Sequence, residues 1–208
     1  MNRKKYVLLL SGGLDSAVCL YMAKFKGYNI EALVFDYGQR HCREIKNAKK
    51  LASINGIKIH WIKFCFDWNA GSLVDRSADL PCRGMRAIGA GSVPSTFVPG
   101  RNLIFLSFGL SLALSIKARG VIIGANQVDF SGYPDCRDNF LRSFENTALL
   151  SGGIRKGAFE ISAPLINMSK PQIVKKAVEL KVPLELTWSC YKGGRKPCGM
   201  CDSCRIRE

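Results

Sequence analysis

The chain has 208 residues, with 31 Lys or Arg against 16 Asp or Glu, so its formal net charge is +15. A composition that is 47% hydrophobic and 23% charged is that of a globular domain, and it excludes a disordered or acidic tail-like protein. The longest uncharged stretch, 102–116, is shorter than the roughly 20 apolar residues of a membrane-spanning helix. The apolar run 6–10 is too short for a secretory signal, so we expect a cytoplasmic protein without a membrane segment.

Strand and helix patterns alternate along the chain. In order, we predict strand 6–10, helix 17–25, strand 30–35, helix 42–55, strand 57–62, helix 101–119, strand 121–124, helix 138–150, strand 159–163 and a last helix ending near residue 180. In that last helix we expect Ser169 as the N-cap and Pro171 as the first helical residue. Apolar strands that alternate with helices predict an α/β fold, an open parallel sheet with helices on both faces.

We divide the chain into an α/β domain, 1–187, and a C-terminal segment, 188–208. The second has almost no aliphatic side chains, so it cannot fold around a core of its own. Within the first, 67–99 has no sustained hydrophobic period and is predicted to be a long loop or insertion. Loops of this length in compact domains are commonly functional.

The hexapeptide Ser11-Gly12-Gly13-Leu14-Asp15-Ser16 joins the first strand to the first helix. Ligands bind at this edge of a parallel sheet, where helix N–H groups favour anions. The two glycines let the backbone approach a phosphate, and both serines add hydroxyl donors. Asp15 would repel a phosphate unless a divalent cation lies between them, and the lysine of a Walker motif is absent. The alternative is a glycine turn that only connects strand to helix.

The hexapeptide resembles the S-G-G-x-D-S motif of the PP-loop ATP pyrophosphatases. That resemblance implies adenylation of a substrate, with ATP broken between its α and β phosphates and the pyrophosphate held by the loop. Such chemistry needs positioning and charge stabilisation more than it needs a nucleophile.

Four of the nine cysteines, Cys190, Cys198, Cys201 and Cys204, lie close to the C-terminus, with Gly199 providing a bend between them. Four thiolates at this spacing can enclose Zn²⁺ in a closed, structural site. A [4Fe-4S] cluster is the competing interpretation. The other five are expected to be buried small residues or incidental thiols: Cys19, Cys42, Cys65, Cys82 and Cys136.

Polar segments follow the predicted strands at 36–41 and 129–137, and another, 98–102, leads into the central helix. In a parallel sheet these segments gather at the edge that carries the hexapeptide. Taken singly, each residue in them could be an ordinary solvated loop residue. Their convergence favours a ligand site.

Individual residues in these segments have plausible roles. Asp129 and Asp135 could bind metal or substrate N–H groups, and Tyr133 could stack on a flat ring. Arg101 or Arg137 could hold a carboxylate or phosphate through two hydrogen bonds.

Six motifs together resemble the 7-cyano-7-deazaguanine synthases of the queuosine pathway over nearly the whole chain: L-S-G-G-L-D-S, D-Y-G-Q-R-H, V-P-G-R-N, S-G-Y-P-D-C-R, T-W-S-C-Y and C-G-M-C-D-S-C. The resemblance implies an ATP-dependent ligase that forms C–N bonds, converting the deazapurine carboxylate 7-carboxy-7-deazaguanine and ammonia into the nitrile. It also implies a homodimer and one structural Zn²⁺ on the four cysteines. The implied ATP loop comprises Leu10, Ser11, Gly12, Gly13, Leu14, Asp15, Ser16, Ala17, Val18, Cys19 and Leu20.

We hypothesise that the carboxylate attacks the α-phosphorus of ATP, with Mg²⁺ near Asp15, that ammonia then displaces AMP, and that a second ATP activates the amide. The residues assigned to this chemistry are Asp15, Ser16, Asp129 and Asp135 as catalytic groups, and Arg101, Asn102, Tyr133, Asp135 and Arg137 as substrate contacts. Asp129, Asp135 or solvent would deprotonate the amide.

Two other functions fit parts of the sequence. A PP-loop enzyme that modifies tRNA, such as a thiolase or lysidine synthase, would explain the net charge but usually carries an added RNA-binding domain, for which 208 residues leave little room. A basic zinc module that binds nucleic acid would leave the hexapeptide without a role. We therefore do not expect a nucleic-acid partner.

Overall fold

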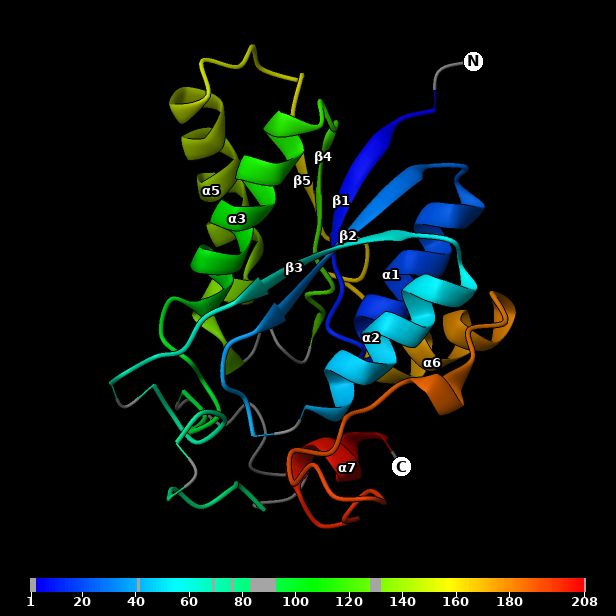
Figure 1. Ribbon diagram of the computed structural model, residues 1–208, viewed down its shortest axis with the longest axis vertical. Helices are drawn as coiled ribbons and strands as arrows, with labels where there is room; N and C mark the ends of the chain where they lie inside the picture. The colour runs from blue at the N-terminus through cyan, green and yellow to red at the C-terminus, as the bar shows by residue number, and fades with distance from the viewer. Residues whose placement is uncertain are drawn as a thin grey trace.

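The computed structural model describes residues 3–40, 42–68, 70–75, 77–82, 93–127 and 132–207. In this part of the chain, five parallel strands form one sheet with the order β3-β2-β1-β4-β5 (Figure 1). The strands are β1 Lys5–Leu9, β2 Asn29–Asp36, β3 Lys58–Lys63, β4 Gly120–Ile122 and β5 Glu160–Ser162. In the register of the central strand, Leu8 lies beside Ala32 of β2 and Ile122 of β4.

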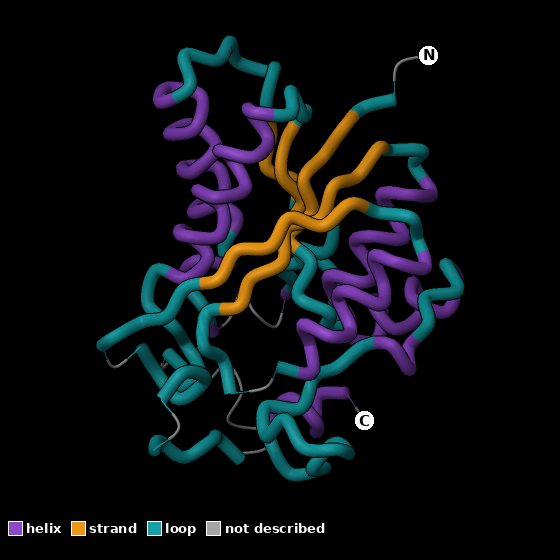
Figure 2. The backbone as a smooth tube through the Cα atoms, viewed as in Figure 1, coloured by secondary structure: helices purple, strands orange, loops and turns teal. Residues whose placement is uncertain are grey.

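Helices cover both faces of the sheet (Figure 2). On one face lie α1 Leu14–Phe25, α2 Arg43–Ile54 and α6 Lys170–Glu179, and on the other lie α3 Arg101–Ser115 and α5 Asp138–Ser151. Successive side chains of β1 point to opposite faces, so Leu8 packs with α1, α2 and α6 whereas Val7 packs with α3 and α5. The predicted α/β fold with a doubly covered parallel sheet is confirmed.

The strand order reverses at β1, which lies between β2 and β4. The chain leaves β1 toward α1 on one face of the sheet, and it enters β4 from α3 on the other. In an open α/β sheet, this divergence leaves a crevice at the carboxyl ends of the two strands. The sequence 11–16 follows β1 directly and therefore begins at this crevice.

Several predicted helix boundaries were wrong. Helix α1 begins at Leu14, three residues before its predicted start. The helix predicted for 101–119 ends at Ser115, because Lys117 has a φ of 53° and the N–H of Ala118 turns back to the carbonyl of Ala113 at 2.7 Å. Pro171 is the second helical residue rather than the first, since α6 begins at Lys170 after the N-cap Ser169. Proline is tolerated there because first-turn N–H groups have no partner within the helix.

The C-terminal segment packs against the α/β domain. The N–H of Trp188 donates to the carbonyl of Gly12 at 3.0 Å, and the N–H of Asp202 donates to the carbonyl of Pro81 at 3.2 Å. A short helix that the sequence did not predict, α7 Asp202–Arg207, closes the described chain. The described residues of 67–99 form no helix or strand. Among the described residues, no helix combines the length and apolar content that crossing a membrane requires.

Gly12 has a conformation that an L-residue rarely adopts, with a φ of 88°. A Cβ at this position would lie 2.0 Å from the carbonyl oxygen of Glu44 in α2. Gly12→Ala is therefore expected to lower the free energy of unfolding by more than the roughly 1–2 kcal/mol that a left-handed conformation costs. Gly27→Ala is the matched control, since Gly27 also has positive φ but open space around the added carbon. Equal losses in urea unfolding would show that the contact with α2 is unimportant.

Candidate active site

A cavity of about 300 Å³ lies at the carboxyl ends of β1 and β4. Its lining comes from segments that are distant in the sequence but meet at this edge of the sheet. It includes Ser11, Gly13, Asp15, Ser16, Tyr37, Arg101, Asn102, Phe105, Tyr133, Cys136, Lys170, Trp188 and Arg207. Nine of the sixteen predicted nucleotide, substrate and catalytic residues that the structure describes thus line one cavity, and the four cysteines lie outside its lining.

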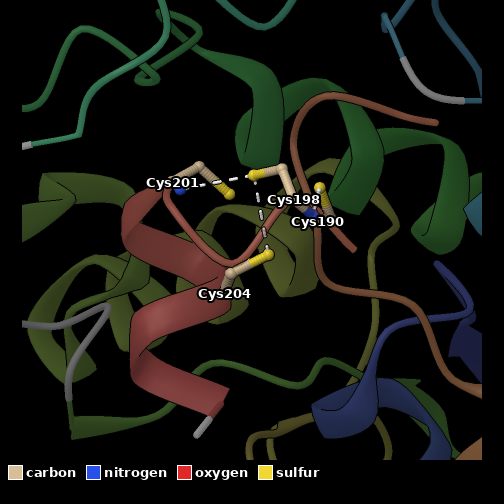
Figure 3. A group of neighbouring side chains, drawn as sticks. All are labelled: Cys190, Cys198, Cys201 and Cys204. Atoms are coloured by element: carbon tan, nitrogen blue, oxygen red, sulfur yellow. Dashed lines mark hydrogen bonds between the residues drawn. The ribbon is translucent and has the colours of Figure 1, made fainter. Parts of the chain in front are cut away.

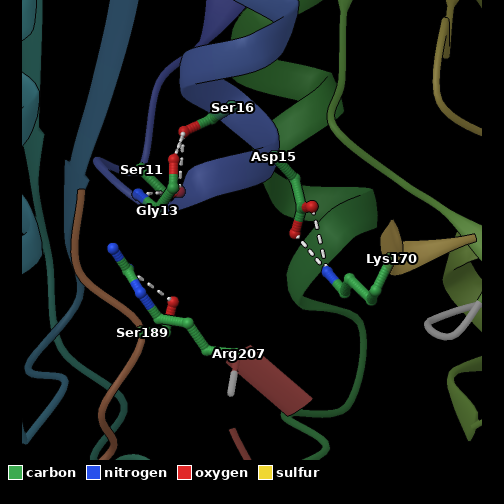
Figure 4. Close-up of polar contacts among 7 residues, drawn as sticks. All are labelled: Ser11, Gly13, Asp15, Ser16, Lys170, Ser189 and Arg207. Atoms are coloured by element: carbon green, nitrogen blue, oxygen red, sulfur yellow. Dashed lines mark hydrogen bonds and ion pairs between the residues drawn. The ribbon is translucent and has the colours of Figure 1, made fainter. Parts of the chain in front are cut away.

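The loop 11–16 is a compact turn held by its own serines (Figure 4). The Ser11 and Ser16 hydroxyl oxygens lie 3.0 Å apart, and the N–H of Gly13 donates to the Ser11 hydroxyl at 3.2 Å. The N–H of Gly12 donates to the Ser16 hydroxyl at 3.3 Å. Gly13 is the N-cap of α1 and has no side chain to cap the first turn. The open helix start beside the cavity favours an anion.

Asp15 forms an ion pair that the sequence did not reveal. The ammonium group of Lys170, at the start of α6, donates to both carboxylate oxygens at 2.7 and 2.9 Å (Figure 4). Both side chains are about three-quarters buried and line the cavity. Lys170 offsets the charge of Asp15 and places a second charged group at the cavity. The sequence did not indicate this pair because Lys170 lies in an ordinary helix start.

The outer residues of the predicted ATP loop lie at different depths. Leu10 and Leu14 line the cavity. Ala17, Val18, Cys19 and Leu20 lie in α1, fully buried in the core beneath the loop. These four pack α1 against the core, and none of them borders the cavity.

Arg101 is a cation without a close carboxylate partner among the described residues. One terminal nitrogen of its guanidinium donates to the Tyr37 hydroxyl at 3.4 Å, and its buried Nε has no hydrogen-bond partner in the part of the chain that the structure describes. The carbon of the guanidinium lies about 6 Å from the Tyr37 and Phe105 ring centres. The Gln39 side chain holds the turn after β2, because it accepts the Tyr37 N–H at 2.8 Å and donates to the Phe35 carbonyl at 3.2 Å. The buried Nε of Arg101, which lacks a hydrogen-bond partner among the described residues, suits an anionic ligand.

Asp135, Asn102 and Cys136 form a hydrogen-bonded group at the start of α3. The carboxylate of Asp135 accepts the N–H of Asn102 at 3.1 Å and so caps a helix whose N-cap is Gly100. The side-chain amide of Asn102 donates to the Asp135 carbonyl at 3.3 Å and to the Cys136 sulfur at 3.2 Å. Burial raises the pKa of the Asp135 carboxyl. Asn102 and Cys136 line the cavity, whereas Asp135 lies behind them.

The remaining predicted substrate residues are placed differently. Tyr133 lines the cavity, and its hydroxyl lies 2.6 Å from the Thr96 hydroxyl. Arg137 is exposed and does not border the cavity. Asp129 lies outside the described residues.

The C-terminal segment contributes cavity residues that sequence reasoning missed. Arg207 extends from α7 into the region of the loop and donates to the Ser189 hydroxyl at 3.2 Å and the Thr187 carbonyl at 3.3 Å (Figure 4). Trp188 lies under the guanidinium of Arg43, whose carbon is 4.3 Å from the ring centre. The available signal was the motif T-W-S-C-Y, which is part of the family resemblance but in which no role was assigned to Trp188 or Ser189.

The four C-terminal cysteines converge (Figure 3). All four sulfur atoms lie within 4.8 Å of one another, and those of Cys198 and Cys204 are 3.9 Å apart. Four sulfurs at about 2.3 Å from a tetrahedral metal are separated by about 3.8 Å, so the geometry fits. The N–H groups of Cys198 and Cys201 each donate to a cysteine sulfur at 3.4 Å. The cluster can therefore hold a metal ion, and Gly199 provides the bend with a φ of 69°.

Solved structures share the fold at low sequence identity. The NMN synthetase from Francisella tularensis has a TM-score of 0.55 at 18% identity, covering 93% of this chain and 69% of that protein. The U34-tRNA thiolase NcsA from Methanococcus maripaludis, determined with its [4Fe-4S] cluster, has a TM-score of 0.54 at 19% identity, covering 100% and 64%. At these identities the similarity establishes the fold alone.

Sequence comparison is more specific. Proteins named 7-cyano-7-deazaguanine synthase are 44% identical in Gloeothece citriformis, covering 100% of this chain and 91% of that protein, and 47% identical in Synechococcus elongatus, covering 98% and 89%. The relative of that name in Oceanobacillus iheyensis is 45% identical, covering 100% and 93%. The sequence profile of the family described as queuosine biosynthesis protein QueC matches residues 5–208. The chain therefore belongs to the QueC family.

Proposed function

We propose that the protein converts 7-carboxy-7-deazaguanine and ammonia into 7-cyano-7-deazaguanine at the expense of ATP. One observation carries this proposal: the phosphate-binding loop 11–16 and the buried guanidinium of Arg101 line the same cavity. The loop suits a nucleotide, and the guanidinium suits the carboxylate that the nucleotide must activate. The relatives' shared name supplies the identity of the nitrile product, 7-cyano-7-deazaguanine, and the acid is the carboxylate that corresponds to it.

In the first step the substrate carboxylate attacks the α-phosphorus of ATP, and pyrophosphate leaves toward the loop 11–16. Lys170 and the first-turn N–H groups of α1 offset its growing negative charge. Asp15 would hold Mg²⁺, which supplies further charge neutralisation on the phosphates when bound. Arg101 holds the carboxylate in line for attack.

In the second step ammonia displaces AMP and leaves an amide. The amide oxygen then attacks the α-phosphorus of a second ATP and releases pyrophosphate, and loss of AMP and of both N–H protons gives the nitrile. Asp135 is hydrogen-bonded to the N–H of Asn102 and lies beside the Cys136 sulfur, and burial raises the pKa of its carboxyl, which favours a role as proton acceptor. Asp129 stays a candidate for the same role.

The four cysteines would hold Zn²⁺, a closed ligand set that stabilises a segment without a core. By fixing this segment they position Trp188, Ser189 and Arg207 at the cavity. The homodimer and the cytoplasmic location stay predictions.

Asp15→Ala is expected to lower the rate of pyrophosphate release by about 100-fold, because the variant loses both the cation site and the orientation of Lys170. The unfolding midpoint should change little, since a partly exposed ion pair contributes about 0–1 kcal/mol. Asp138→Ala is the control: Asp138, like Asp15, lies in the first turn of a helix and forms an ion pair, with Arg142 at 2.7 Å, but it lies outside the cavity. An Asp15→Ala variant with normal pyrophosphate release would overturn the role of this carboxylate.

The choice of acceptor tests the function directly. Purified protein is given MgATP and ammonium with either 7-carboxy-7-deazaguanine or unmodified tRNA, and the products are identified by mass spectrometry. The acid should release pyrophosphate and yield a nitrile, whereas tRNA should release none. Pyrophosphate release with tRNA alone would instead favour a tRNA-modifying enzyme.

A further inference from the structure

Cys136 is a cysteine of the cavity that the proposed steps do not use. Its side chain is 6% exposed and lines the same cavity as Arg101 and the loop 11–16. The sequence indicated only a buried or incidental thiol. Its position places a nucleophilic atom beside the group that is proposed to bind the substrate carboxylate.

The neighbours of Cys136 favour a reactive sulfur. The amide of Asn102 donates to the sulfur at 3.2 Å, and the Arg101 guanidinium is close enough for an electrostatic interaction with it. Both stabilise negative charge on sulfur. The Asp135 carboxylate lies 4.0 Å from the sulfur, at the outer limit of a hydrogen bond, and can receive the thiol proton.

The cavity also contains a donor that indicates a ligand at this point. The Nε of Arg101 is buried and has no hydrogen-bond partner among the described residues. A buried donor of this kind is normally satisfied, so a ligand acceptor is expected beside it. A carboxylate bound there would bring its carbon near the Cys136 sulfur.

We propose that Cys136 is the catalytic nucleophile that takes the acyl group from the acyl adenylate as a thioester. The sulfur attacks the carbonyl carbon, a C–S bond forms, and the bond from that carbon to the bridging oxygen breaks as AMP leaves with the electron pair. Asp135 accepts the thiol proton. Ammonia then forms the C–N bond, the C–S bond breaks, Asp135 returns its proton to sulfur, and the nitrogen loses one proton to water.

A covalent intermediate suits a reaction that uses the loop 11–16 twice. While the acyl group stays on sulfur, AMP and pyrophosphate can leave and a second ATP can bind. The amide then forms beside a nucleotide that is ready to activate it. This proposal rests on the proposed function, because it needs the acyl adenylate.

The thioester can be trapped by leaving out ammonia. Wild-type protein is mixed with MgATP and 7-carboxy-7-deazaguanine in ammonia-free buffer, quenched in acid, and examined by intact-protein mass spectrometry while pyrophosphate is measured in parallel. We expect a mass increase equal to the acid less one water, located on Cys136 by peptide fragmentation and lost when ammonium is added. Pyrophosphate release without this adduct would overturn the proposal and leave the proposed function standing. Absence of pyrophosphate release would overturn both.

Variants give an independent result. Cys136→Ala should still release pyrophosphate in a first turnover but form no adduct, and its rate of nitrile formation should fall by about 100-fold or more. Cys136→Ser keeps a hydrogen-bond acceptor for Asn102 and should have normal stability. If it forms the nitrile as slowly as Cys136→Ala, the loss of rate is not caused by a structural change. Cys65→Ala, an exposed cysteine outside the cavity, is the control. Nitrile formation by Cys136→Ala at the wild-type rate would contradict a covalent role.

Discussion

Replacement of Cys201 by Ser is expected to remove the bound metal and to destabilise the protein strongly. Structural Zn²⁺ sites have apparent binding free energies of about 10–16 kcal/mol, and the segment they fix here has no other core. A loss of about 4 kcal/mol would lower the unfolding midpoint by roughly 8–16 °C in a chain of this size. Metal analysis and thermal unfolding monitored by circular dichroism measure the two effects.

Activity should fall in the same variant, because the segment also carries cavity residues. Trp188 is hydrogen-bonded to the loop through Gly12, and Arg207 lines the cavity. Cys65→Ser is the matched control, since Cys65 is exposed and lies outside the cluster. Measuring iron and sulfide beside zinc distinguishes the two candidate occupants of this site, Zn²⁺ and a [4Fe-4S] cluster. A Cys201→Ser variant that lost its metal but kept its midpoint would show that the metal is not structural.

Arg101→Met is expected to lower kcat/KM for the acid by roughly 10²–10³-fold, since it removes the charge that stabilises the reacting carboxylate. Stability should be unchanged or higher, because the substitution removes a buried cation whose Nε has no hydrogen-bond partner among the described residues. Most substitutions of buried groups lower activity and stability together. A variant with a lower kcat/KM but unchanged or higher stability would therefore identify a binding role for Arg101. The measurements are steady-state kinetics and urea unfolding.

Arg137→Met provides the comparison within the same predicted site. Arg137 is exposed and does not border the cavity, so the variant should keep the wild-type kcat/KM. If Arg101→Met were as active as Arg137→Met, the guanidinium of Arg101 would have no part in substrate binding.

The sheet and its helices could be predicted because apolar runs separated by turn residues are local properties of the sequence. The end of α3 could not be predicted, because the helix ends where Lys117 adopts a positive φ, and a lysine side chain does not favour that conformation. The short helix α7 was missed for a related reason: it begins beside Cys201 and has little apolar content of its own. Its one buried residue is Cys204, a member of the cysteine cluster, so a hydrophobic period could not indicate it.

The site was predictable where its residues are contiguous. The loop 11–16 and the cysteine spacing are local patterns with direct chemical meaning. Lys170 is 155 positions from Asp15, and only the fold brings the two together. The turn around Asp135 likewise decides which neighbouring side chain faces inward: Cys136 lines the cavity and Arg137 points to solvent.

The most direct test of the central claim, that the loop 11–16 receives pyrophosphate from ATP during activation of an acid, is the identity of the nucleotide products. Phosphorus NMR of a reaction with ATP, 7-carboxy-7-deazaguanine and ammonium should show AMP and pyrophosphate in equal amounts, two of each per nitrile formed. Formation of ADP and inorganic phosphate, or no consumption of ATP with this acid, would contradict the account.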